Sequence, residues 1–172
     1  MRSPIALISS LLLPLAFASS AIAETTVTVE KTHLCCGSCV KAATKAVESV
    51  PGDKAQIDKD ADKITITADN DADAQKAVDA LVAAGFYGTV SSGTIKNDSG
   101  APSGNVKSLT LTTHNCCKKC TTAINKIVKS VPGASGEAQP KEDTFTVTGD
   151  FDATALVKAF NDAGFAVTSP TK

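Results

Sequence analysis

Apolar and polar positions follow one order that occurs twice along the chain. Residues 25–33 alternate between apolar and polar side chains, which predicts a strand. Residues 39–50 carry apolar side chains at helical spacing and end at a Pro-Gly pair. Two more alternating stretches follow, then a second helix over residues 71–84 and a last short strand over residues 86–90. This order, β-α-β-β-α-β, predicts a ferredoxin-like domain.

The second half of the chain repeats the first. Three short sequences recur in the same order: Thr-His-x-Cys-Cys-x-x-Cys at 32–39 and 113–120, Ser-Val-Pro-Gly at 49–52 and 130–133, and Ala-Gly-Phe at 84–86 and 163–165. The second strand of the second copy is weakly marked, because Gly136 and Pro140 interrupt it. The predicted fold class is therefore α+β, with two tandem ferredoxin-like domains.

The repeat divides the chain into four segments. A signal peptide is expected over residues 1–23, a first domain over 24–92, a linker over 93–105 and a second domain over 106–172. The linker is rich in Ser, Gly, Asn and Asp, a composition typical of flexible connections. It would allow the two domains to move relative to each other.

The first residues have the pattern of a secretory signal. A basic residue, Arg2, precedes an apolar stretch over residues 5–17, and Ala21-Ile22-Ala23 matches the small-x-small cleavage pattern before Glu24. A membrane anchor is the alternative, but the stretch is short and is broken by prolines and serines. The sequence predicts export to the periplasm or the extracellular space.

Charge and composition narrow the possible partners. The chain has 17 basic and 18 acidic residues, a formal net charge of −1, which gives no basis for binding nucleic acid or an anionic membrane surface. No later segment is apolar enough to predict membrane insertion of the mature chain. Cleavage would also remove Met1, the one methionine, so a soft metal site would have to use cysteine and, second to it, histidine.

Eight residues with metal-ligating side chains gather in the two loops that precede the first helix of each copy. They are His33, Cys35, Cys36, Cys39, His114, Cys116, Cys117 and Cys120. Disulfides within such tight groups would close very small loops and stabilise little. The helix N-terminus favours thiolates at this place, and thiolates select soft ions such as Cu(I) and Zn(II).

The two loops resemble those of the heavy-metal-associated domain family, which includes copper chaperones and the periplasmic mercury-binding protein. In that family the loop has the pattern Gly-Met-Thr-Cys-x-x-Cys, and the resemblance covers both copies outside the linker. It implies that the two cysteines of each CxxC pair bind one ion per domain: Cys36 with Cys39, and Cys117 with Cys120. It also implies transfer of the ion to a metal transporter or acceptor protein.

Both loops depart from the family pattern at three positions. The family's Gly, Met and Thr are replaced by His33, Leu34 and Cys35 in the first copy and by His114, Asn115 and Cys116 in the second. The third cysteine could bind the metal or only line the loop. The histidine could be a ligand, pack against the protein or tune the thiolates. Cu(I), Zn(II) and Hg(II) all remain candidates.

The predicted function is an exported, non-enzymatic metal-binding protein that acts as scavenger, buffer or chaperone. A thiol–disulfide oxidoreductase is the alternative, since CxxC at a helix start is also a redox motif. A third possibility is a redox- or metal-gated adhesion module in which the two domains clamp one ion. The sequence leaves open whether the two loops bind separately or share an ion.

Overall fold

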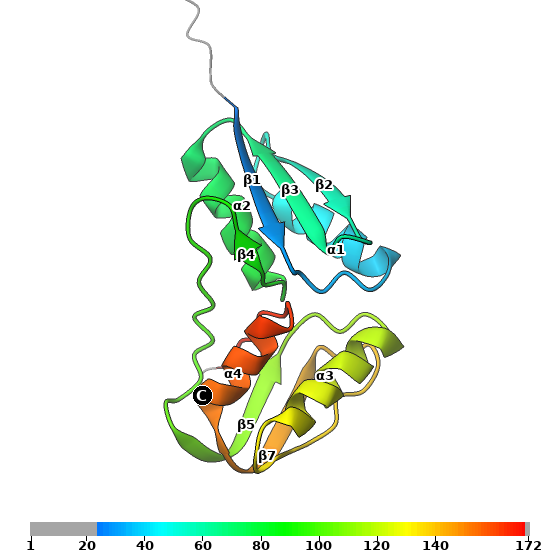
Figure 1. The fold of residues 1–172 in the computed structure, drawn as a ribbon, viewed down its shortest axis with the longest axis vertical. Coiled ribbons are helices and arrows are strands. Elements are labelled where there is room, and N and C mark those ends of the chain that lie inside the picture. The colour runs from blue at the N-terminus through cyan, green and yellow to red at the C-terminus, as the bar shows by residue number, and fades with distance from the viewer. Residues whose placement is uncertain (1–23, 171–172) are drawn as a thin grey trace, which may run out of the picture.

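The computed structural model describes residues 24–170 as two domains stacked end to end (Figure 1). The predicted signal peptide lies outside the described residues. The first domain contains β1 (Thr25–Glu30), α1 (Gly37–Val47), β2 (Lys54–Asp58), β3 (Lys63–Ala68), α2 (Asp71–Ala83) and β4 (Thr89–Val90). The second contains β5 (Asn105–Thr112), α3 (Lys118–Ser130), β6 (Ala134–Ser135), β7 (Thr144–Asp152) and α4 (Ala153–Asp162).

The first domain has the complete ferredoxin-like arrangement. Its strands form one antiparallel sheet in the order β2-β3-β1-β4, and the two helices cover one face of it. The apolar positions that alternate along β1 and β3 point into this layer, where Val29, Ile64 and Ile66 are at most 1% exposed. The side-chain amide oxygen of Asn70 accepts a hydrogen bond from the Asp73 backbone N–H and so caps α2. The α+β class predicted from the repeat is confirmed.

The second domain departs from the predicted pattern at its last strand. Its described sheet has the order β5-β7-β6, and the last strand that the repeat predicts for the second copy, over residues 165–167, is not formed. One bridge between Thr112 and Thr168 remains of it. Phe165 forms a bridge with Phe86 of the first domain, and Phe86 likewise lies outside β4, which begins at Thr89 rather than at the predicted residue 86. As expected, β6 is very short, next to Gly136.

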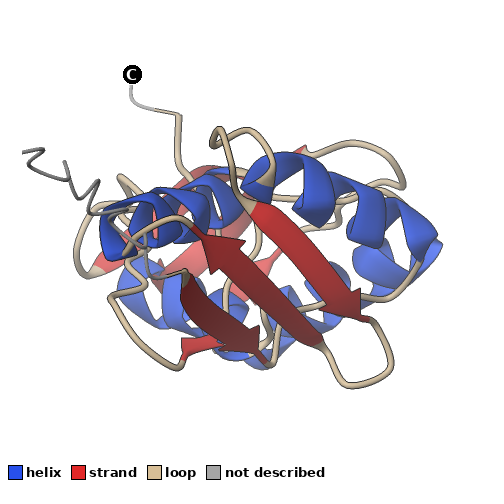
Figure 2. Ribbon diagram, turned by 90° about the horizontal axis from the view of Figure 1, so that it is seen from above, coloured by secondary structure: helices blue, strands red, loops and turns tan. Residues whose placement is uncertain are grey.

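Both first helices begin earlier than their apolar spacing predicts. The helix expected from residue 39 begins at Gly37, with Cys36 as its N-cap, and Cys117 has the same place before α3. The cysteine loops therefore end directly at the two helix N-termini. Figure 2 shows the helices and strands of both domains from above.

The linker follows one side of both domains (Figure 1). The Gln75 side chain accepts a hydrogen bond from the Thr94 backbone N–H and donates one to the Thr94 carbonyl, at 2.9 and 2.7 Å. Farther along, the Asn97 side chain donates to that of Asn161 at 2.8 Å. The linker is thus tied to α2 of the first domain and to α4 of the second. No helix within residues 24–170 is long and apolar enough to cross a membrane.

Candidate metal centre

The two cysteine loops face each other where the domains meet. In Figure 1 the loop between β1 and α1 lies opposite the loop between β5 and α3. Cys120 of the second loop is fully buried and belongs to the hydrophobic core of the first domain. The two loops therefore form one site at the junction.

The six cysteine sulfurs lie in one cluster, and all six cysteines are free thiols. Within the loops, four Sγ–Sγ distances are short: Cys35–Cys39 at 3.6 Å, Cys36–Cys39 at 3.7 Å, Cys116–Cys120 at 3.8 Å and Cys117–Cys120 at 3.9 Å. Between the loops, five are as short: Cys35–Cys120 at 3.3 Å, Cys36–Cys116 at 3.4 Å, Cys35–Cys117 and Cys39–Cys116 at 3.5 Å, and Cys39–Cys120 at 3.8 Å. The sulfurs of each loop therefore lie as close to those of the other loop as to one another.

Paired glycines allow this close approach. The carbonyl of Gly164 accepts hydrogen bonds from the N–H groups of His33 and Tyr87 at 3.3 and 3.1 Å. In the other direction, the carbonyl of Gly85 accepts one from Ala166 at 3.1 Å. Both glycines have positive φ, +84° and +88°, a region in which a side chain costs free energy. A Cβ on Gly164 would lie 2.6 Å from the carbonyl oxygen of Lys31 and closer still to the nitrogen of His33.

Each histidine packs on the other domain rather than on its own. The His33 ring stacks on Phe165 with centroids 4.3 Å apart, and the His114 ring packs on Phe86 at 4.8 Å. The Nε2 atoms of both rings are buried without a hydrogen-bond partner among the described residues. One ring nitrogen of His33 lies within 4.8 Å of the sulfurs of Cys35 and Cys120. The repeated Ala-Gly-Phe sequence thus supplies the junction: Phe86 and Phe165 each pack in the core of their own domain and also against a histidine of the other domain.

The thiols differ in how strongly their surroundings favour ionisation. Hydrogen bonding by the Cys120 thiol, joined by contacts with His114 and other thiols, outweighs burial and lowers the pKa of Cys39 to about 2. The Cys120 thiol donates its hydrogen bond to the Cys39 sulfur, and this bond together with burial raises the pKa of Cys120. Burial likewise raises the pKa of Cys35 to about 12 and that of Cys116 as well. Without a cation, negative charge gathers on a minority of the six sulfurs.

Helix geometry favours the outer thiolate of the second loop. Burial alone would raise the pKa of Cys117. The backbone N–H groups of Cys120 and Lys119 and the Cys35 thiol together outweigh burial and lower this pKa to about 6. Both N–H groups belong to the first turn of α3, where a helix N-terminus favours negative charge. The side chains of Lys118 and Lys119 themselves are exposed. Burial also lowers the pKa of His33, which keeps that ring neutral and able to accept or donate one bond.

Asn115 is compatible with complete burial because its polar atoms are all paired. Its amide donates to the carbonyls of Gln139 and Glu142 at 2.7 and 2.8 Å. Its oxygen accepts from the Thr121 hydroxyl at 2.9 Å. In the first loop, Leu34 fills the equivalent place with 2% exposure. Both residues shape the loop from beneath, one by polar contacts and one by apolar packing.

Fold and donor set together define a two-domain α+β protein with a cysteine cluster that could hold a metal ion. No protein-family model matches the chain, and no curated protein matches it. Among solved structures, the N-terminal soluble domains of Bacillus subtilis CopA are 14% identical, with 86% of this chain and 94% of that chain covered and a TM-score of 0.32. The first two RRM domains of the yeast poly(U)-binding protein Pub1 are 11% identical, with 86% and 100% covered and a TM-score of 0.23. At these TM-scores neither likeness bears on function.

Proposed function

We propose that the protein is an exported, non-enzymatic carrier that binds soft metal ions between its two domains. The observation that supports this most directly is the convergence of six free thiols within 3.3–3.9 Å of their neighbours. Thiols packed so densely repel one another once ionised, and a bound cation removes that repulsion. Because thiolate is a soft donor, the ion is Cu(I), Zn(II) or Hg(II) rather than magnesium or calcium.

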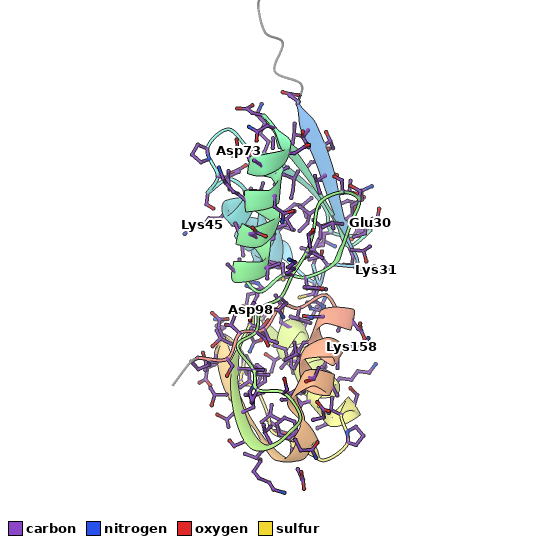
Figure 3. The ribbon with its side chains drawn as sticks, turned by 90° about the vertical axis from the view of Figure 1, so that its left-hand side faces the viewer. Glu30, Lys31, Lys45, Asp73, Asp98 and Lys158 are labelled. Atoms are coloured by element: carbon purple, nitrogen blue, oxygen red, sulfur yellow. The ribbon has the colours of Figure 1, made fainter. Side chains whose placement is uncertain are left out.

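The burial of the site supports capture and release of metal. Cys39 and Cys120 are 0% exposed, so an ion bound to them would be shielded from solvent. Cys36 and Cys117 are half-buried at the outer edge, where an acceptor protein could exchange ligands with them. The ion would then pass to a metal transporter or acceptor protein with its own thiolates. Figure 3 shows the exposed side chains of Lys45 and Lys158 on the flanks of the two domains, away from the junction, and that of Lys31 close to it.

Metal binding is tested on the reduced protein, purified without oxygen and offered Cu(I), Zn(II) or Hg(II) in competition with a chelator. We expect at least one ion to be retained at submicromolar affinity, with the thiols protected from alkylation. A protein that retains no ion while its CxxC pairs cycle between thiol and disulfide would be an oxidoreductase. Ser38→Ala is the matched control, since Ser38 lies between Cys36 and Cys39, in the first turn of α1, but is exposed.

Export is tested separately from metal binding. The full-length chain is expressed in a bacterium, and the protein found outside the cytoplasm is sequenced from its N-terminus. We expect the first residue to be Glu24. Protein that stays in the cytoplasm with its first residues uncleaved would refute export and leave the metal site unaffected.

A further inference from the structure

The sulfur cluster has more order than a single-ion site needs. Besides the nine short distances, two groups of three sulfurs lie within 4.8 Å of one another and supply the pairs Cys35–Cys36, Cys36–Cys117 and Cys116–Cys117. Each sulfur is then adjacent to four of the other five. The three other pairs, Cys35 with Cys116, Cys36 with Cys120, and Cys39 with Cys117, are not among these twelve. This adjacency is that of an octahedron.

An octahedron of sulfurs offers triangular faces but no tetrahedral site. No four of its corners are all adjacent, so these six described cysteines present no ready tetrathiolate cage of the kind that structural Zn(II) prefers. Each triangular face presents three sulfurs to one ion. Cu(I) can complete its coordination with three thiolates, whereas Zn(II) on a face would need a fourth ligand, such as the ring nitrogen of His33 beside Cys35 and Cys120.

Four alternate faces can be filled together. They are Cys35-Cys36-Cys117, Cys36-Cys39-Cys116, Cys116-Cys117-Cys120 and Cys35-Cys39-Cys120. Any two of these faces share one sulfur, and every sulfur belongs to two of them, so each thiolate bridges two ions. Resting on the proposed metal-binding function, we infer that the two domains together hold one cluster of four Cu(I) ions bridged by all six cysteines.

The dimensions and the charge agree with this cluster. An ion about 2.3 Å from each of three sulfurs has those sulfurs about 4.0 Å apart. The sulfurs of the innermost face lie 3.3–3.8 Å apart, so loading requires only a small expansion. Six thiolates with four monovalent cations carry a charge of −2. The N-termini of α1 and α3, capped by Cys36 and Cys117, both lie at the cluster, where helix dipoles favour negative charge.

Nuclearity is measured by anaerobic titration of the whole protein with Cu(I), followed by native mass spectrometry and X-ray absorption. We expect monomers with four ions that fill cooperatively, trigonal sulfur coordination and a metal–metal scattering shell. One or two ions per chain without that shell would overturn the cluster and keep the metal-binding function. Copper-bridged dimers would overturn the single-chain cluster, and no bound ion would overturn both proposals.

One cysteine variant supplies an independent test. Cys35 lies on two of the four occupied faces, so Cys35→Ser should lower the load from four ions to two and abolish the cooperative filling. Ser38→Ala, in the first turn of α1 but exposed, should keep four ions. A Cys35→Ser protein that still takes four ions would show that this sulfur is not a bridge. Circular dichroism of each variant before titration excludes unfolding as the cause of a lower load.

Discussion

Replacing Gly164 by alanine separates the two domains without removing any cysteine. The new Cβ would lie against the backbone of Lys31 and His33, where real Cβ atoms stay at about 3.4 Å or farther, so the contact must open by about 1 Å. Overpacking of this kind costs about 1–3 kcal/mol. The sulfur distances between the loops, now 3.3–3.8 Å, would widen beyond the span of one trigonal ion.

Because metal binding and domain docking are coupled, we expect this cost to appear in metal affinity. A loss of about 1–3 kcal/mol corresponds to an affinity for Cu(I) that is lower by a factor of about 5–150. The measurement is competition between the protein and a Cu(I) chelator of known affinity, under anaerobic conditions. Gly85→Ala should have the same effect from the other domain, since its Cβ would lie 3.0 Å from that of His114 and closer to its nitrogen.

Gly104 provides the matched control for this experiment. It also has positive φ, +81°, but a Cβ there meets nothing within 4 Å. Gly104→Ala therefore has the same backbone strain, about 1 kcal/mol, without any clash between the domains. Its Cu(I) affinity should equal that of the unmodified protein. If Gly164→Ala also binds with unchanged affinity and stoichiometry, the loops bind metal independently and the shared site is wrong.

Three further substitutions test the site and its support. Replacing Cys36 and Cys39 together by serine should remove more than half of the bound metal, because both sulfurs bridge to the other loop; loss of half would indicate two separate sites. Asn115→Leu should destabilise the fold by about 1–3 kcal/mol in urea unfolding, since it removes the three hydrogen bonds that the buried Asn115 side chain makes with the Thr121 hydroxyl and the carbonyls of Gln139 and Glu142; an unchanged midpoint would contradict that role. Burial raises the pKa of Asp53 above 3.8, so its ionisation costs stability as pH rises through the window from 3.8 to the folded pKa. Asp53→Asn should therefore stabilise the protein by about 1 kcal/mol at pH 7, and this gain should vanish below that window; a gain that is equal at pH 3 and pH 7 would show that charge is not the cause.

The repeat made the fold accessible to prediction, but it could not show how the domains dock. Local alternation and helical spacing depend on residues close in sequence, so the order of elements was predicted correctly for both copies except at the last strand. Docking depends on the Ala-Gly-Phe turn at residues 84–86 meeting its copy at residues 163–165. Positive φ at Gly85 and Gly164 indicates why this turn recurs, yet the sequence alone gives no partner for it.

The docked structure also explains why both loops depart from the family pattern in the same way. A loop that binds one ion by itself needs only its CxxC pair. The added cysteine of the first loop, Cys35, instead lies closest to sulfurs of the second loop, 3.3 Å from Cys120 and 3.5 Å from Cys117. By the same symmetry, Cys116 lies 3.4 Å from Cys36, nearer than any sulfur of its own loop among the short contacts. Each added cysteine therefore lies closest to a sulfur of the other domain, which is the position that a ligand shared by both loops requires.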